Sequence, residues 1–165
     1  MSNLGSESFS AQTSVWPLVI LRVGLGYLFF KVACPKFNSL LGTDKLSNQL
    51  TGWINETPSQ WYPWYRNYIS HYFIPHSDLL TYLVVFGEVA VALCLIIGFM
   101  TRPALLAAVF MNLNYQLASG YRPGAASIIN LIFIFAELAL LFTTVGRAFG
   151  VDYFLNKRYP RSPLW

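Results

Sequence analysis

The sequence predicts an all-α protein: a four-helix transmembrane bundle with an amphipathic, aromatic-rich outer loop between the first and second helices. Hydrophobic residues make up 55% of the chain and charged residues only 11%, whereas a soluble domain carries about 25% charged residues. Four apolar runs each approach the ~20 residues that a helix needs to cross a bilayer. Aromatic residues reach 17%, including five Trp and ten Tyr, which favour the membrane–water interface.

The apolar runs define the expected domain organisation. A membrane domain over 15–146 lies between a polar N-terminal tail, 1–14, and a basic C-terminal tail, 147–165. The first helix is expected to end at Pro35, because proline lacks the N–H that continues a helix. The expected spans are 15–34, 79–99, 104–119 and 126–145.

The long connection between the first two spans, 36–78, is polar but rich in Trp and Tyr. Its composition predicts an amphipathic segment that lies in the headgroup layer or caps the bundle. Two short helices are expected inside it, at 43–54 and 61–72, the second because Trp64, Tyr68 and Tyr72 recur at helical spacing.

Charge distribution predicts the orientation and the partners. Four spans place both termini on one side, which also carries Arg102 and the basic tail. The positive-inside rule therefore predicts cytoplasmic termini in a multi-pass protein of the cell (inner) membrane or a derived photosynthetic membrane. Membrane lipid and other membrane-protein subunits are the expected partners, and scattered basic residues predict no nucleic-acid partner.

Polar side chains inside the spans are candidate site residues, because an ionisable group near the bilayer centre costs at least ~2.5–3.5 kcal/mol. Counted along each helix at 1.5 Å per residue, Arg22 lies about 10 Å deep, Glu137 about 12 Å, Asn112 about 13 Å and Glu88 about 16 Å. These similar depths predict a buried layer of Arg22, Glu88, Asn112 and Glu137.

Within this layer, Arg22 is expected to form a bidentate pair with one glutamate. The other glutamate would remain for proton exchange, which makes Glu88 and Glu137 the candidate catalytic residues. A purely structural role, in which the network only orients the four helices, is the alternative.

A second polar layer is expected nearer the outer surface, formed by Lys31, Gln116 and Asn130. Lys31 can instead extend its ammonium to the outer headgroups. Asn114 points away from Asn112 on a helix, so it would face a neighbouring helix or another subunit.

No metal site and no covalently bound cofactor are predicted. Cys34 and Cys94 form no CxxC pair, and His71 and His76 both fall in the outer loop. The sequence carries no redox centre of its own, so any electrons would come from a partner or from the substrate.

The motifs LRVGLGYLFF, FGEVAVALCLIIGFMTRPALLAAVFMNLNYQLA and GRAFGVDYFL together resemble DoxD, the small membrane subunit of thiosulfate:quinone oxidoreductase, and the wider DoxX group. The resemblance extends over most of the chain. It implies a small membrane subunit that acts in electron delivery to quinone, usually with a second protein. Arg22, Glu88, Arg102, Asn112 and Asn114 fall on its motif positions.

Three functions remain open. In the first, the chain is a subunit of a quinone-linked oxidoreductase, with a quinone beside the polar layer. In the second, it is a non-catalytic accessory subunit of a larger respiratory or photosynthetic complex. A small transporter is a third, although 165 residues show no inverted repeat.

Overall fold

The computed structural model describes residues 15–58, 60–119 and 125–160, and these residues are all-helical, as the sequence predicted. The predicted N-terminal tail and the turn at 120–124 lie outside the described residues. The helices are α1 (Trp16–Leu40), α2 (Lys45–Glu56), α3 (Pro63–Tyr68), the π-helix η1 (Ile69–Phe73), α4 (Ser77–Ile97), α5 (Thr101–Ser119), α6 (Ala125–Leu141), α7 (Val145–Ala148) and α8 (Val151–Arg158).

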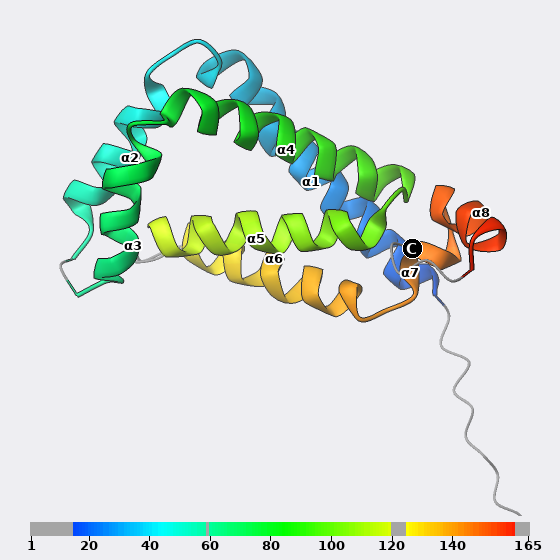
Figure 1. Ribbon diagram of the computed structural model, residues 1–165. Coiled ribbons are helices and arrows are strands. Elements are labelled where there is room, and N and C mark those ends of the chain that lie inside the picture. The colour runs from blue at the N-terminus through cyan, green and yellow to red at the C-terminus, as the bar shows by residue number, and fades with distance from the viewer. Residues whose placement is uncertain (1–14, 59, 120–124, 161–165) are drawn as a thin grey trace, which may run out of the picture.

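Four long helices form two pairs, α1 with α4 and α5 with α6, which diverge toward the end covered by α2 and α3 (Figure 1). The first pair packs closely because Gly26 has no side chain: a Cβ there would lie 2.9 Å from Ile96 Cγ1. Near the converging end the pairs share a core of small and branched residues, among them Ala92, Leu95, Leu105 and Ala108.

The predicted end of the first helix at Pro35 is wrong, because α1 continues to Leu40 with Pro35 inside it. Tertiary packing holds the extra turn: the ring of Phe37 meets that of Phe86 on α4 edge-on, with centroids 5.7 Å apart, and Leu40 is buried. The extension carries Lys36, which was expected in the outer loop, onto a transmembrane-length helix.

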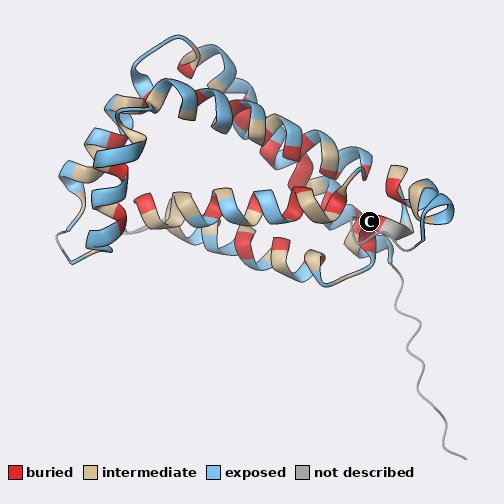
Figure 2. Ribbon diagram, viewed as in Figure 1, coloured by how far each residue is buried: buried red, intermediate tan, exposed pale blue. Residues whose placement is uncertain are grey.

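The predicted amphipathic loop folds as a helical cap. Its two short helices are present, with bounds shifted from those predicted, and the second one passes into η1. Leu46, Leu50 and Tyr65 turn inward and are buried, while most of the outward surface is exposed (Figure 2). The Trp61 indole Nε1–H donates to Leu117 O at 3.0 Å and ties the cap to α5.

At the opposite end, α7 and α8 close the bundle. Both oxygens of Asp152 accept backbone N–H groups at the start of α5, from Met100 and Thr101, at 2.8 Å each. Gly98 ends α4 in the left-handed region with φ 70°, where a side chain would also collide with Arg22. The C-terminal segment is therefore fastened to the α4–α5 turn.

Two of the described helices, α1 and α4, are long and apolar enough to cross a membrane, and the apolar stretch Ser127–Leu141 of α6 is shorter. Large apolar side chains cover the outer faces of these helices, including Ile20, Leu83 and Phe135. Such an exposed apolar belt is typical of a surface that faces lipid.

Candidate functional site

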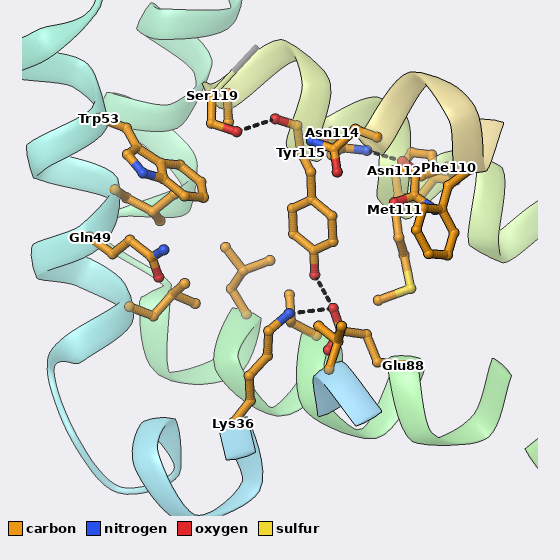
Figure 3. Close-up of a pocket in the computed structure, with 18 of the residues that line it drawn as sticks. Lys36, Gln49, Trp53, Glu88, Phe110, Met111, Asn112, Asn114, Tyr115 and Ser119 are labelled. Atoms are coloured by element: carbon orange, nitrogen blue, oxygen red, sulfur yellow. Dashed lines mark hydrogen bonds and ion pairs between the residues drawn. The ribbon is translucent and has the colours of Figure 1, made fainter. Parts of the chain in front are cut away.

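A cavity of about 380 Å³ occupies the space where the helix pairs diverge. Side chains from α1, α2, α4, α5 and α6 line it, with Tyr65 of α3 and Phe73 of η1 at its cap. Most of the wall is apolar, and Lys36, Glu88 and Tyr115 meet at one place on it (Figure 3). This division is typical of a small-molecule site.

The polar region is built on Glu88, which is buried on α4. Lys36 Nζ donates to Glu88 Oε1 at 2.5 Å, and the hydroxyl of Tyr115 donates to the same oxygen at 2.6 Å (Figure 3). Lys36 comes from α1 and Tyr115 from α5, so the triad joins three helices. Lys36 also lies 5.0 Å from the centroid of the Tyr115 ring.

The second carboxylate oxygen of this triad has unused capacity. Glu88 Oε2 is buried and has no hydrogen-bond partner among the described residues. A carboxylate can accept at both oxygens, but Oε2 is shielded from the cavity, and both hydrogen bonds of the triad go to Oε1. Lys36 retains further N–H donors beyond the one given to Glu88. The triad can therefore donate a hydrogen bond to a bound molecule through Lys36.

The rest of the lining is suited to a flat or chain-like apolar ligand. Trp53 and Gln49 reach in from α2, and Met111 and Phe110 from α5 (Figure 3). Aromatic and flexible sulfur-containing side chains adapt their packing to such ligands. The site thus combines an apolar cavity with one charged, hydrogen-bonding region of its wall.

Glu137 and Asn112, two members of the predicted layer, form a separate pair. Asn112 Nδ2 donates to Glu137 Oε1 at 2.7 Å, and both residues are buried between α5 and α6. Asn112 lines the cavity, whereas Glu137 lies behind it. The structure therefore places Glu88, and not Glu137, at the cavity wall.

The predicted pairing of Arg22 with a glutamate is wrong. The Arg22 guanidinium is fully buried near the converging end of the bundle, where Nη1 donates to Val145 O at 3.2 Å and to Phe149 O at 2.6 Å. Carbonyls of the C-terminal segment thus take the place of the expected carboxylate. The helices are rotated and shifted relative to one another. Similar depths along the helices therefore did not bring Arg22 into contact with a glutamate.

The other predicted polar residues are dispersed. Asn114 Oδ1 accepts from the Tyr65 hydroxyl at 2.7 Å, so its neighbour is the cap. Gln116 Nε2 donates to Ser127 Oγ at 3.2 Å between α5 and α6. Asn130 lines the cavity, and Lys31 is exposed on the outer face of α1. The second polar layer is therefore not one connected group.

Sequence reasoning did not predict roles for Lys36 and Tyr115. A signal for Lys36 was available, because it follows Arg22 by 14 residues (36 − 22), which is nearly four turns and returns to the same helix face. The assumed break at Pro35 hid this periodicity. Tyr115 lies in an ordinary helical run of the sequence, four residues before Ser119. Only its hydrogen bond to Glu88 in the structure identifies it as a site residue.

The family model described as "DoxD: TQO small subunit DoxD" matches residues 16–163 of the chain. This range contains all of the helices described above, and it agrees with the resemblance seen in the sequence motifs. No solved structure matches the chain.

Proposed function

Because this chain belongs to the DoxD family, we propose that it is the membrane subunit of an electron-transfer system and that its cavity binds a quinone for reduction. The observation that carries this proposal is the Lys36–Glu88–Tyr115 triad on the wall of a largely apolar cavity. A quinone has the matching division, with a polar ring and an apolar tail.

We propose that α1, α4, α5 and α6 each cross the membrane. The rings of Trp16 and Phe149 lie 5.6 Å apart, so the start of α1 and the segment after α6 are at the same end of the bundle. An even number of crossings accounts for this arrangement. The cap of α2, α3 and η1 would then lie in the opposite headgroup layer, where its Trp and Tyr side chains are favoured.

Reduction of a quinone adds two electrons and two protons, and each carbonyl oxygen becomes a hydroxyl. The electrons would come from a partner subunit or from the donor substrate. Lys36 has N–H donors beyond the one given to Glu88, and we propose that it donates a hydrogen bond to a carbonyl oxygen and stabilises the negative charge that develops on it. One of the two protons would reach that oxygen through the Lys36–Glu88 pair, with Tyr115 holding the Glu88 carboxylate in place, and the other would come from solvent.

The test is Glu88→Gln in the intact complex, with quinone reduction followed by absorbance. Glutamine preserves the size of the side chain but cannot exchange a proton, so we expect quinol formation to be abolished while the complex still assembles. Asp78→Asn, at the exposed start of the same helix, is the matched control and should retain full turnover. Normal turnover of Glu88→Gln would refute the catalytic assignment.

A second candidate function, a non-catalytic accessory subunit, is supported by the aromatic surface of the cap. Tyr62, Trp64, Tyr68 and Tyr72 are all exposed there, and aromatic residues are enriched at protein interfaces. This alternative predicts that the protein copurifies at fixed stoichiometry with a cofactor-bearing complex. Purification of the chain alone with quinone-dependent activity would exclude it.

A further inference from the structure

Part of the cavity wall is also part of the outer surface of the bundle. Val32 on α1 is 51% exposed and Ile129 on α6 is 46% exposed, yet both line the cavity. Leu28, one turn before Val32, is 42% exposed and lines it as well. Residues that line the cavity and are also exposed on the outer surface mark an opening. Here these residues place the opening between α1 and α6.

Two phenylalanines mark one edge of this opening. Phe29 on α1 and Phe133 on α6 meet edge-on with ring centroids 5.9 Å apart, which joins the two helices. Val32 lies three residues after Phe29, and Ile129 four residues before Phe133. Because residues three and four apart share a helix face, Val32 and Ile129 lie about one turn from the ring contact, on its cavity side.

The residues that frame the opening are apolar, and they lie at a defined distance from Lys36 along the chain. Along α1, Val32 precedes Lys36 by four residues and Leu28 precedes it by eight. These separations correspond to about 6 Å and 12 Å at 1.5 Å per residue. A molecule whose polar ring contacts Lys36 would therefore have the opening beside the first part of its tail.

On the other side of the bundle, Phe110 of α5 also lines the cavity and is exposed. That side is less suited to a hydrocarbon chain, because the Asn114 side chain next to it is hydrogen-bonded to Tyr65 of the cap. The gap between α1 and α6 is framed by the apolar Leu28, Val32, Ile129 and Phe133, with Asn130 lining the cavity beside Ile129, and this apolar frame fits a tail in contact with lipid.

From these observations we infer that the gap framed by Leu28, Val32, Ile129 and Phe133 is a lateral portal, through which a lipid-soluble ligand enters from the membrane and in which its apolar tail remains. This inference rests on the proposed function and deepens it, because it assigns the residues between which the apolar tail of the quinone lies.

The test compares two probes that share one head group: ubiquinone with its isoprenoid tail, and the tail-less parent benzoquinone, both tritium-labelled. Binding to the full chain is measured as label retained after detergent-phase gel filtration. Val32→Trp and Ile129→Trp fill the portal. Val23→Trp on α1 and Ile132→Trp on α6 are matched controls, because both residues are exposed and neither lines the cavity.

We expect each portal variant to weaken binding of the tailed quinone roughly tenfold, as when a tail loses the contacts of about two buried CH₂ groups. Binding of the tail-less quinone should stay unchanged, and the control variants should bind both probes normally. Unchanged binding of the tailed quinone to the portal variants would overturn the inference, and so would an equal loss of both probes. Failure of the wild-type chain to bind either probe would instead refute the proposed function itself.

Discussion

Lys36 and Glu88 form an ion pair across α1 and α4, with Nζ 2.5 Å from Oε1, at the wall of the cavity. Lys36 directly follows Pro35 within α1, and Glu88 is buried near the middle of α4. The pair places a cation where a quinone oxygen would gain negative charge. It also neutralises a carboxylate that would be costly to bury alone.

The first prediction separates the structural role of this pair from its chemical role. Lys36→Met leaves Glu88 buried without its cation, so we expect a loss of roughly 2–3 kcal/mol of stability. The double variant Lys36→Met/Glu88→Leu removes both charges and should recover most of that loss without recovering quinone reduction. Unfolding by denaturing detergent, followed by circular dichroism, measures stability. Equal stability of the single and double variants would show that the pair is not coupled.

The second prediction concerns Asn112 and Glu137, which are paired behind the cavity. Asn112→Leu leaves Glu137 Oε1 without its donor, and Oε2 has no donor within the described part of the chain. We therefore expect a loss of about 1–3 kcal/mol of stability, the cost of an unsatisfied buried polar group. Glu137→Gln still offers Asn112 an acceptor and should retain both the fold and quinone reduction. Abolished reduction in a stable Glu137→Gln protein would return Glu137 to the catalytic candidates.

The third prediction follows from the position of Arg22 at the C-terminal segment. Arg22→Met removes the donor to Val145 O and Phe149 O, and hydrogen bonds to a charged group contribute about 1.5–3 kcal/mol. We expect α7 and α8 to detach more often, so trypsin should cleave faster after Lys157. Ile20→Met, on the exposed face of the same helix, is the control. Quinone binding should be retained, because Arg22 does not line the cavity.

The fourth prediction tests the close approach of α1 to α4. A methyl group at Gly26 would lie 3.0 Å from Ala92 O and from Ile96 N, which are backbone atoms that cannot yield locally. Gly26→Ala should therefore cost about 1–3 kcal/mol through overpacking. A methyl group at Gly24 would meet nothing within 4 Å, so Gly24→Ala should gain up to about 1 kcal/mol of helix stability. Thermal unfolding of the two variants should therefore shift in opposite directions.

The fifth prediction concerns pH and the cap. Burial, and then the nearby Tyr68, raise the pKa of Tyr65 above its ordinary value. The folded state thus favours the neutral phenol, which donates to Asn114. This contribution to stability is fully present below pH ~10, the ordinary tyrosine pKa, and is lost as the pH rises above it.

An alkaline titration checks this assignment. The tyrosinate absorbance that disappears in Tyr65→Phe should belong to a group that ionises above pH ~10, the ordinary tyrosine pKa. As the pH rises above this value, the wild type should lose more stability than the Tyr65→Phe variant does. Ionisation of Tyr65 near pH ~10 would refute its buried position.

The sequence by itself determined the helical class, the long apolar helices and the identity of the polar residues within them, because these depend on composition and local periodicity. The motifs also predicted the family, which the match over residues 16–163 confirmed. The amphipathic outer segment was likewise predictable, because its Trp and Tyr residues recur at helical spacing.

Only the tertiary structure decided which polar groups meet. Depth along a helix says nothing about rotation about its axis, so Arg22 contacts carbonyls of the C-terminal segment and not a glutamate. Likewise, local propensity ends a helix at Pro35, whereas packing against α4 carries α1 onward and brings Lys36 to Glu88. That ion pair is a long-range contact, and such contacts depend on how whole helices pack and not on the residues next to them in the chain.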